Sequence, residues 1–600
     1  MLNEAERRLW DAFPRGATVD LGQGDPAAED FDPDTWPEDR HVRAEVIARL
    51  LLDVRTEPGR HARVVLAGAR IIGELNLSGG QSDRQLVLTR CWLDKPPDFT
   101  GASSGRTAFH RTRLPGLIGL NWQVSGSASF DESRCSGLIN LFGARISGQL
   151  RFEGATLVNP DSEALYADGL TVGQDVFCCC GFTVTGETRL VGVRIGGQLA
   201  FNGATLTNPR GNALTAAGLT VHGDMFCSDG FTATGTIGLA GARIGGKLDL
   251  TGATLTSPGA QALAAAGLTV HGDMICGDGF TATGTIGLAG ARISGRLDLS
   301  WSTLTSPGGN ALSAAGLTVD QDVDFVKCVA SGQVRLAGAR IGGELDFTWS
   351  TLTNRGGTAL DLEGVRCPHV RLPAQIDGRI DLRHAGLGTL TLPAVSDPPP
   401  MRLGGLTYVE LDADLEPPVA ERIAWLHRDP DGFHPQPYDQ LAAYYRSAGH
   451  DHNARQVLLA KRRTHRLTAP NAWRTPRPVR SLLATAWRLP GWLLDAFSGY
   501  GYAPRRTFYW LVAAVITGTV LLHDAAPEQD PTRSTAINAL LLALDATVPT
   551  APFGIREQVA LTGAHYATAL GLQILGYGLA LGVLAVLAAS RTRRPRPRSR

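Results

Sequence analysis

Acidic and basic side chains recur at a fixed spacing along the middle of this 600-residue chain. Two aspartate columns and one arginine column repeat every 48 or 49 residues. The first aspartate column contains Asp175, Asp224, Asp273 and Asp322, the second contains Asp249, Asp298 and Asp346, and the arginine column contains Arg145, Arg194, Arg243, Arg292 and Arg340. Carboxylates that share one face of a protein can cleave glycosidic bonds or bind calcium, so these columns are the first candidates for chemistry.

The spacing argues against both glycosidic cleavage and calcium binding. If one repeated unit holds two stacked coils, equivalent carboxylates lie about 10 Å apart, which is twice the strand spacing. Calcium takes its oxygen ligands at about 2.4 Å, and only the upper end of the range for inverting glycosidases, about 6.5–9.5 Å, comes near. A catalytic group is also needed once, whereas a structural position is needed in every coil. We therefore predict solvated columns whose charges the arginines partly offset.

The nine cysteines are a second candidate. Cys178, Cys227 and Cys276 are 49 residues apart, and Phe325 occupies the next equivalent position. A position that accepts cysteine or phenylalanine is predicted to be a buried apolar column, because free cysteine packs as a small hydrophobe. The run from Cys178 to Cys180 places two thiols on one side of a strand and one on the other, so a metal site there is a minor alternative to packing. No C-x-x-C pair is present, and disulfides are not expected in a cytoplasmic protein.

Two histidines also repeat. His222 and His271 each stand two residues before an aspartate and five before a cysteine, a grouping that suggests a metal site. The neighbouring units have Gly173 and Asp320 at the same position, so the site would be missing from them. We therefore expect surface histidines and predict no metal ligands.

No motif for a bound cofactor is visible. The sequence has no G-x-G-x-x-G between a strand and a helix, no Walker lysine, no C-x-x-C-H and no ferredoxin-type cysteine run. The glycine pairs at 245–246 and 342–343 lack the following helix that binds a pyrophosphate. If a redox cofactor is present, haem ligation by His523 or His565, near the ends of two apolar segments, is the best of the weak alternatives. We predict no cofactor and assign no catalytic residue.

The repeated unit itself predicts the fold that positions these columns. Within one unit, apolar residues recur about every five positions, as at Leu239, Ile244, Leu250 and Leu255. This period fits neither a helix nor a long strand, but it fits short strands that turn a corner every five or six residues. Four glycines lie near the corners, where a positive φ costs little; they are Gly241, Gly245, Gly246 and Gly252. Four such faces make one coil, so a 49-residue unit is predicted to form two coils of a parallel β-helix.

The units contain A-x-L-like triplets, such as Ala242 to Ile244 and Ala253 to Leu255. These triplets resemble the repeats of the pentapeptide-repeat family, although a six-residue step from Ile244 to Leu250 breaks the strict period of five. The resemblance implies a right-handed β-helix. Some members of that family resemble acidic DNA duplexes and bind topoisomerase.

Over nearly its full length, the chain also resembles a group of large actinobacterial proteins in which two membrane segments follow such a repeat domain. The segments that carry this resemblance are EAERRLWDAFPRG from Glu4, HVRAEVIARLLL from His41, YDQLAAYYRSAGHDHNARQVLLAKRR from Tyr438, GYGYAP from Gly499 and LDATVPTAPFG from Leu544. Members are commonly labelled membrane-associated oxidoreductases. The resemblance therefore implies a redox activity for which the residues provide no motif.

The elements divide the chain into five predicted regions. Residues 1–60 form a helical cap, 61–412 the β-helix, 413–467 a helical hairpin, 468–506 a basic linker and 507–600 a transmembrane hairpin with a basic tail. In the helical hairpin, Gly449 is expected to end one helix and Asp451 or Asn453 to begin the next, with His450 and His452 exposed. The chain is therefore predicted to be mainly β, with a helical C-terminal third.

Two apolar segments, Thr507 to His523 and Gly563 to Ser590, are predicted to span a membrane. The shorter segment from Ala536 to Val548 contains Asp545 and is expected to be interfacial or re-entrant. Basic residues flank the pair on both sides, whereas the loop between the two segments has only two arginines. By the positive-inside rule both flanks are cytoplasmic. We thus expect the β-helix on the cytoplasmic face of the cell membrane, with the basic flanks on anionic lipid.

Composition narrows the functional classes. The 57 basic and 57 acidic residues give a formal net charge of zero, so no bulk attraction to nucleic acid is expected. Three functions stay open: a non-enzymatic scaffold for a protein partner or for copies of the chain, a membrane-associated oxidoreductase, and a DNA mimic. The scaffold ranks first, because it explains the recurrence and the absence of a pocket motif, whereas a DNA mimic needs a strongly acidic surface.

Overall fold

The computed structural model describes residues 1–28, 31–54, 61–392, 399–412, 418–468, 504–525, 535–548 and 561–591. The chain divides into two compact units, which are Met1–Pro417 with Arg428–Pro430, and Pro418–His427 with Asp431–Arg600. The described part of the first unit is mainly β, and that of the second is helical.

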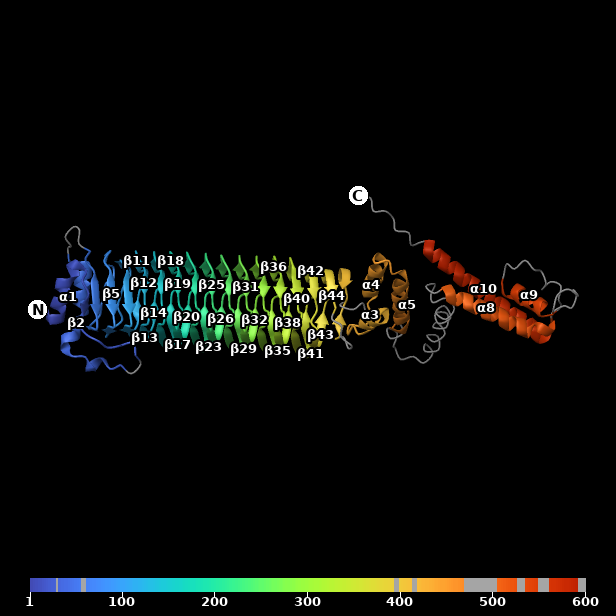
Figure 1. The fold of residues 1–600 in the computed structure, drawn as a ribbon, viewed down its shortest axis with the longest axis horizontal. Helices are drawn as coiled ribbons and strands as arrows, with labels where there is room; N and C mark the ends of the chain where they lie inside the picture. The colour runs from blue at the N-terminus through green and yellow to red at the C-terminus, as the bar shows by residue number, and fades with distance from the viewer. Residues whose placement is uncertain are drawn as a thin grey trace, which may run out of the picture. The chain divides into compact units, whose positions relative to one another are not determined.

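The first unit is a parallel β-solenoid of about 15 turns, in which strands of neighbouring coils pair side by side (Figure 1). Its strands form two long sheets of 28 and 18 strands. Arg243 pairs with Thr269 in the next coil, and Thr269 pairs in turn with Arg292, which is the arginine of the next repeated unit. The repeated unit therefore makes two coils, as predicted, and the coil that starts at Arg243 is slightly longer than the coil that starts at Thr269.

Each regular coil contains three strands. The first is β15 (Arg145–Ile146), β18 (Thr171–Val172), β21 (Arg194–Ile195), β24 (Thr220–Val221), β27 (Arg243–Ile244), β30 (Thr269–Val270), β33 (Arg292–Ile293), β36 (Thr318–Val319) or β39 (Arg340–Ile341). The second is β16 (Leu150–Arg151), β19 (Val176–Phe177), β22 (Leu199–Ala200), β25 (Met225–Phe226), β28 (Leu248–Asp249), β31 (Met274–Ile275), β34 (Leu297–Asp298), β37 (Val323–Asp324) or β40 (Glu344–Asp346). The third is β17 (Thr156–Tyr166), β20 (Thr183–Arg189), β23 (Thr205–Thr215), β26 (Thr232–Gly238), β29 (Thr254–Ala264), β32 (Thr281–Gly287), β35 (Thr303–Ser313), β38 (Val329–Arg335) or β41 (Thr351–Asp361).

The sequence predicts four faces per coil. The first two strands form one face each, and the third strand spans the other two. It has 11 residues in one coil and 7 in the next. In the longer strand, the extra residues bulge outward between Thr256 and Gln261, opposite Thr283 and Thr285. The bulge accounts for the difference in length between the two coils.

A two-residue strand places one side chain inside the coil and one outside, because side chains alternate along a strand. Ile244 and Leu248 point into the core and are at most 1% exposed, whereas Arg243 on the same strand as Ile244 is exposed. Burying one such aliphatic side chain contributes about 1.5–3 kcal/mol. The contribution recurs in every coil, so the stack is held together by the repeated inward positions.

Glycine serves two different purposes at the corners. Gly241 has a positive φ of 63°, as the sequence suggests. At Gly245 and Gly246 the need is space: a Cβ on Gly245 would lie 2.0 Å from the carbonyl oxygen of His222, and one on Gly246 would lie 1.9 Å from Oδ1 of Asp224. The expectation of positive φ is wrong for this pair, because two coils approach there too closely for a side chain.

The ends of the solenoid are less regular. The N-terminal coils contain β3 (Val64–Ala67), β4 (Arg70–Ile72), β5 (Leu86–Thr89), β6 (Trp92–Leu93), β7 (Ser103–Ser104), β8 (Thr107–His110), β9 (Arg113–Leu114), β10 (Leu117–Ile118), β11 (Gln123–Val124), β12 (Ala128–Ser129), β13 (Arg134–Cys135) and β14 (Ile139–Asn140). The C-terminal coils contain β42 (Arg366–Arg371), β43 (Gln375–Asp381), β44 (Gly386–Thr391), β45 (Met401–Arg402) and β46 (Thr407–Asp412). These strands lie within the predicted range 61–412.

The residues before β3 form a cap. It contains the helices α1 (Glu4–Ala12) and α2 (Ala44–Leu52) and the short turns η1 (Phe13–Arg15), η2 (Pro33–Thr35) and η3 (Glu38–Arg40). It also contains β1 (Val19–Asp20) and β2 (His41–Arg43), which pair with β3 and β4. The cap predicted as helical therefore also supplies a strand to each sheet, which covers edges that would otherwise be open.

The second unit contains the helices α3 (Val419–His427), α4 (Pro435–Ser447) and α5 (Asp451–Thr468). Helices α4 and α5 form the predicted hairpin, and α5 begins at Asp451. His450 and His452 are exposed, as expected. Helix α3 is an additional helix that packs against α5, and the sequence did not indicate it.

Three further helices of this unit pack on one another, namely α8 (Pro504–Leu521), α9 (Thr535–Thr547) and α10 (Gly563–Arg591), with the turn η6 (His523–Ala525) after α8. Their shared core includes Ala514, Leu542 and Leu572. Among the described helices, none is long and apolar enough to cross a lipid bilayer. The predicted spans Thr507 to His523 and Gly563 to Ser590 fall on α8 and α10. Most of the predicted linker, at 469–503, and the tail at 592–600 lie outside the described residues.

Candidate functional site

The predicted arginine column is a straight stripe on the first strand of alternate coils. Arg194, Arg243 and Arg292 are exposed, and each is followed by an isoleucine that points into the core. A threonine of the intervening coil lies between each pair of arginines in the sheet; these are Thr171, Thr220, Thr269 and Thr318. Successive arginines are thus two strands, or about 10 Å, apart. We call Arg145, Arg194, Arg243, Arg292 and Arg340 the arginine stripe.

The arginine stripe carries unneutralised charge. Within the described residues, none of its five arginines makes an ion pair. Its C-terminal end is extended by Arg366, which is exposed and pairs directly with Arg340. The period of the sequence does not reveal Arg366, because this residue follows Arg340 by one coil rather than by a whole repeated unit. The five arginines of the stripe itself are about 10 Å apart, where salt screens the repulsion between neighbours, so a row of like charges is tolerated.

The first aspartate column has a structural role. Oδ1 of each aspartate accepts a hydrogen bond from a backbone N–H of the next coil: Gln198 for Asp175, Lys247 for Asp224, Arg296 for Asp273 and Glu344 for Asp322, at 2.8–3.0 Å. A glycine precedes each of these donors and leaves room for the carboxylate. The column therefore holds a corner of the solenoid together in every second coil, so its recurrence needs no catalytic explanation.

The second aspartate column is less solvated than predicted. The side chains of Asp249, Asp298 and Asp346 are only 14–18% exposed. The period of the sequence does not reveal Asp324, which pairs in register between Asp298 and Asp346 and so brings carboxylates onto adjacent strands. Asp298 and Asp346 are two coils apart, as predicted, but Asp324 places a further carboxylate in the coil between them. Asp324 follows Asp298 by one coil, a spacing that the period of the whole repeated unit hides.

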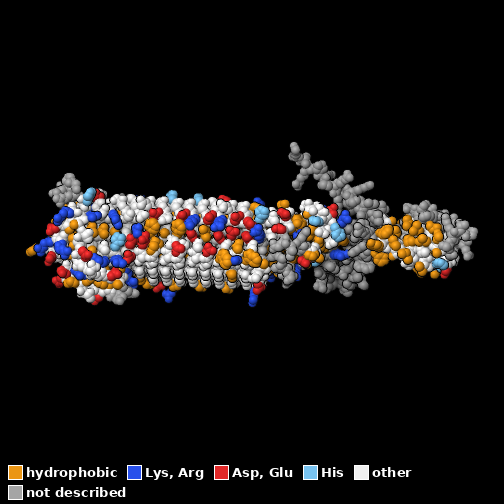
Figure 2. Space-filling model, viewed as in Figure 1, with side chains coloured by type: hydrophobic (Ala, Val, Ile, Leu, Met, Phe, Trp, Pro, Cys, Tyr) orange, Lys and Arg blue, Asp and Glu red, His pale blue; other side chains and the backbone are white. Residues whose placement is uncertain are grey.

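Basic residues other than the arginine stripe neutralise this second column. Asp249 pairs with Lys247 at 3.1 Å, and Asp346 pairs with Arg371 at 3.4 Å. Arg296 lies 3.7 Å from Asp298. The prediction that the stripe offsets these charges is wrong, because the stripe lies on the first strand of the coil and the aspartates on the second. Figure 2 shows charged side chains of both signs along one band of the solenoid, over the second strands labelled in Figure 1.

The electrostatics of Asp324 differ from those of its neighbours. Burial raises the pKa of this carboxyl group to about 6, and the nearby carboxylates of Asp298, Asp322 and Asp346 add to the effect. At Asp249, burial also opposes ionisation, but hydrogen bonds from Thr251 and Lys247 outweigh it and lower the pKa. One column thus contains carboxyl groups whose pKa values are shifted in opposite directions.

The cysteine column is buried, as predicted. Cys178, Cys227 and Cys276 are at most 2% exposed, and burial raises the pKa of each thiol. His222 and His271 are exposed, which also agrees with the prediction. Since Cys227 points into the core and His222 lies at the surface, the structure does not bring the suspected histidine, aspartate and cysteine together.

One group of carboxylates near the C-terminal end of the solenoid has a spacing suited to a metal ion, namely Asp361, Glu363 and Asp381. Arginines already neutralise it. Arg383 contacts Glu363 and Asp381, and Arg335 contacts Asp361 at 3.3 Å. We interpret the group as an ion-pair network that holds the last coils together.

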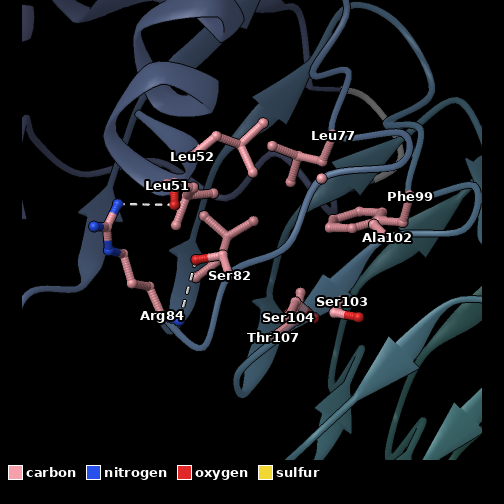
Figure 3. A pocket seen from close by; sticks show the side chains of 12 residues that line it. Leu51, Leu52, Leu77, Ser82, Arg84, Phe99, Ala102, Ser103, Ser104 and Thr107 are labelled. Atoms are coloured by element: carbon pink, nitrogen blue, oxygen red, sulfur yellow. Dashed lines mark hydrogen bonds between the residues drawn. The ribbon is translucent and has the colours of Figure 1, made fainter. Parts of the chain in front are cut away.

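A small pocket lies between the cap and the first coils (Figure 3). It is lined by Leu51, Leu52, Leu77, Leu86, Phe99 and Ala102, with hydroxyl groups from Ser82, Ser103, Ser104 and Thr107. Arg84 is its one charged lining residue, and its guanidinium donates hydrogen bonds to the carbonyl oxygens of Leu50 and Leu51 at 2.7 and 2.8 Å. Arg84 thereby caps the C-terminus of α2. No carboxylate, imidazole or thiol lines this pocket, so its residues offer no general base that could activate one of the hydroxyl groups.

The described structure thus contains repeated surface columns rather than a convergent catalytic centre. Comparisons with protein-family models, with curated proteins and with solved structures find no match for this chain. The resemblances to pentapeptide-repeat proteins and to the actinobacterial membrane proteins therefore stay predictions.

Proposed function

We propose that this chain is a non-enzymatic scaffold whose solenoid binds a protein partner along its length, in the first instance a second copy of itself. The arginine stripe carries the proposal. It is exposed, it repeats every two coils, and within the described residues it makes no ion pair. A row of charged groups at constant spacing on a hydrogen-bonded solenoid is suited to a partner with the same repeat and the opposite charge.

A second copy meets this requirement. The aspartates of the first column belong to the same repeated unit as the arginine stripe, so both repeat at the same distance along the solenoid, and none of these four side chains is buried. Two copies side by side can place arginines of one against acidic residues of the other in unit after unit. One exposed ion pair contributes only about 0–1 kcal/mol, so binding depends on several units acting together.

Sedimentation velocity of the full-length protein at low and high salt tests the proposal. We expect assembly at low salt that is lost in the double variant R243Q/R292Q. The matched control is R210Q/R355Q, because Arg210 and Arg355 are also exposed but lie on the bulged third strands and already contact Asp161 and Asp377. A protein that stays monomeric under all conditions, or an equal response of both double variants, contradicts self-assembly through the stripe.

An absorbance spectrum of the purified chain separates the scaffold from an oxidoreductase. A flavin, haem or iron–sulfur signature near one per chain would replace the scaffold as the best explanation. The arginine stripe already disfavours a DNA mimic, because a mimic presents acidic groups where this face presents guanidinium groups.

Attachment to a lipid surface is the second part of the proposal. The described helices α8, α9 and α10 expose large apolar side chains, among them Phe508, Tyr509, Ile516, Val520 and Ile574. Exposed apolar patches of this kind are typical of surfaces that meet lipid or a partner. Fractionation of cells that express the full chain tests it: we expect the protein in the membrane fraction, and recovery in the cleared lysate without detergent argues against attachment.

A further inference from the structure

The run of three cysteines lies at a corner that follows strand β19. Cys178 points into the core and Cys179 is 7% exposed, whereas Cys180 is exposed. The Sγ atoms of Cys179 and Cys180 lie 3.0 Å apart. The two thiols are therefore in contact at the surface of the coil, and the third is separated from solvent. The predicted alternation of the three thiols along a strand is wrong, because the strand ends at Phe177.

The fold does not require thiols at this corner. The equivalent residues of the next two units are Ser228 with Asp229, and Gly277 with Asp278. Cys180 has a φ of 60°, and Asp229 and Asp278 have φ angles of 53° and 47°. Aspartate is among the residues that tolerate this left-handed conformation best, so cysteine is the unusual choice.

The backbone contacts of the corner are also the same in the different units. The N–H of Gly154 donates to the carbonyl oxygen of Cys179, and that of Gly203 donates to Ser228, both at 3.0 Å. The backbone is thus supported without the sulfur atoms. Structural positions recur in every unit, whereas the pair of adjacent thiols occurs once, which is typical of a functional site.

We propose that Cys179 and Cys180 form a vicinal dithiol site that binds one thiophilic ion, such as trivalent arsenic or Cu(I). Soft thiolate ligands select soft ions. Two sulfur atoms 3.0 Å apart can both reach one ion at a metal–sulfur distance of about 2.3 Å. Cys180 gives the ion access from solvent, and Cys179 closes the chelate from the buried side.

The chemistry needs no oxidant. With phenylarsine oxide, two S–H bonds and the As=O bond break, two As–S bonds form, and one water leaves. With Cu(I), two thiol protons are released and two Cu–S bonds form. Binding of the ion therefore displaces the protons of both thiols.

Reactivity elsewhere in the chain is low. Eight of the nine cysteines are buried, and Cys180 is the exposed one. Burial raises the pKa of Cys91 and Cys135 to about 12, which keeps them protonated and unreactive. A probe that needs two neighbouring thiols should therefore report on one site in the folded chain.

Titration of the reduced full-length protein with phenylarsine oxide, read out by intact mass, tests the site. We expect one phenylarsenic group per chain, and one equivalent of Cu(I) in competition with a chromogenic chelator. The variants C179S and C180D should bind at least about 100-fold more weakly, because each removes one arm of the chelate. They reproduce the residues Ser228 and Asp229 of the next unit, so we expect unchanged thermal unfolding.

The variant C276A is the control, since its thiol is buried in another unit and its loss should leave the titration unchanged. Failure of the wild-type protein to take up either probe overturns the site. So does equal uptake by C180D, because the exposed thiol would then not be a ligand. The site is supported if the wild-type protein takes up the probe and both C179S and C180D abolish this uptake. This outcome does not depend on the result for the arginine stripe.

Discussion

Oδ1 of Asp224 accepts a hydrogen bond of 2.8 Å from the backbone N–H of Lys247, one coil further along the solenoid. The same relationship recurs at Asp175, Asp273 and Asp322, so a side chain closes a corner that backbone hydrogen bonds alone leave incomplete. The geometry also requires Gly246, because any Cβ there would collide with the carboxylate.

Gly246→Ala should lower the free energy of unfolding by about 1–3 kcal/mol through this collision. Gly386→Ala is the control, because its Cβ would meet nothing closer than 3.8 Å. In an Asp224→Ala background, Gly246→Ala should cost less, since the colliding oxygen is gone. Urea denaturation of the four variants measures the coupling, and additive effects would show that the carboxylate is not the obstacle.

The inward and outward positions of a two-residue strand should differ in cost. Ile244→Ala should destabilise the solenoid by about 2–5 kcal/mol, because Ile244 is 1% exposed and its removal leaves a cavity. Arg243→Ala should change stability by no more than about 0.5 kcal/mol, because its side chain is exposed and has no ion pair within the described residues. Thermal unfolding followed by circular dichroism compares them, and similar losses would place the arginine stripe inside rather than outside.

Asp324 and Asp249 should respond to pH in opposite directions. The folded pKa of Asp324, about 6, lies above the unfolded value of 3.8, so the native state binds more protons between these values and stability falls as the pH rises through them. Asp324→Asn should therefore stabilise the protein at pH 7.5, by no more than about 1 kcal/mol because the group is partly solvated, and should have little effect at pH 3.5.

Asp249→Asn is the matched comparison on the same column. Its pKa is lowered in the folded state, so its contribution is present above the unfolded pKa and is lost as the pH falls. The substitution should destabilise the protein at pH 7.5. Denaturation midpoints at the two pH values measure both effects, and a shift of the same sign for the two variants would contradict the assignment.

The N-terminal cap should loosen in acid. The guanidinium of Arg43 lies 2.7 Å from the buried carboxylate of Glu6 and, despite burial, lowers its pKa to about 2, with help from the backbone N–H groups of Asn3 and Arg43. Because the folded pKa is depressed, this contribution is complete above pH 4.5 and is lost as the pH falls towards 2. Glu6→Gln should raise hydrogen exchange in α1 and α2 at pH 7, whereas the exposed Glu45→Gln should not. Equal exchange in the two variants would mean that the Glu6–Arg43 pair does not hold the cap.

The sequence determined the repeat and the side of the coil on which most repeated residues lie. Apolar residues every five positions, with Ile244 inward and Arg243 outward, can be recognised without coordinates because burial requires a contiguous apolar core. The same logic identifies Cys227 as a core residue from its exchange with Phe325. Local patterns of this kind depend only on the spacing of residues along one strand.

Tertiary structure decided the pairing between coils. The bulge in the long strand divides the repeated unit into a longer and a shorter coil. This division places Asp324 in the coil between those of Asp298 and Asp346. The end of a strand at Phe177 brings Cys179 against Cys180. Register and corner geometry arise from backbone hydrogen bonds between residues of different coils, which are far apart along the chain. The period of the sequence therefore does not encode which side chains of neighbouring coils meet.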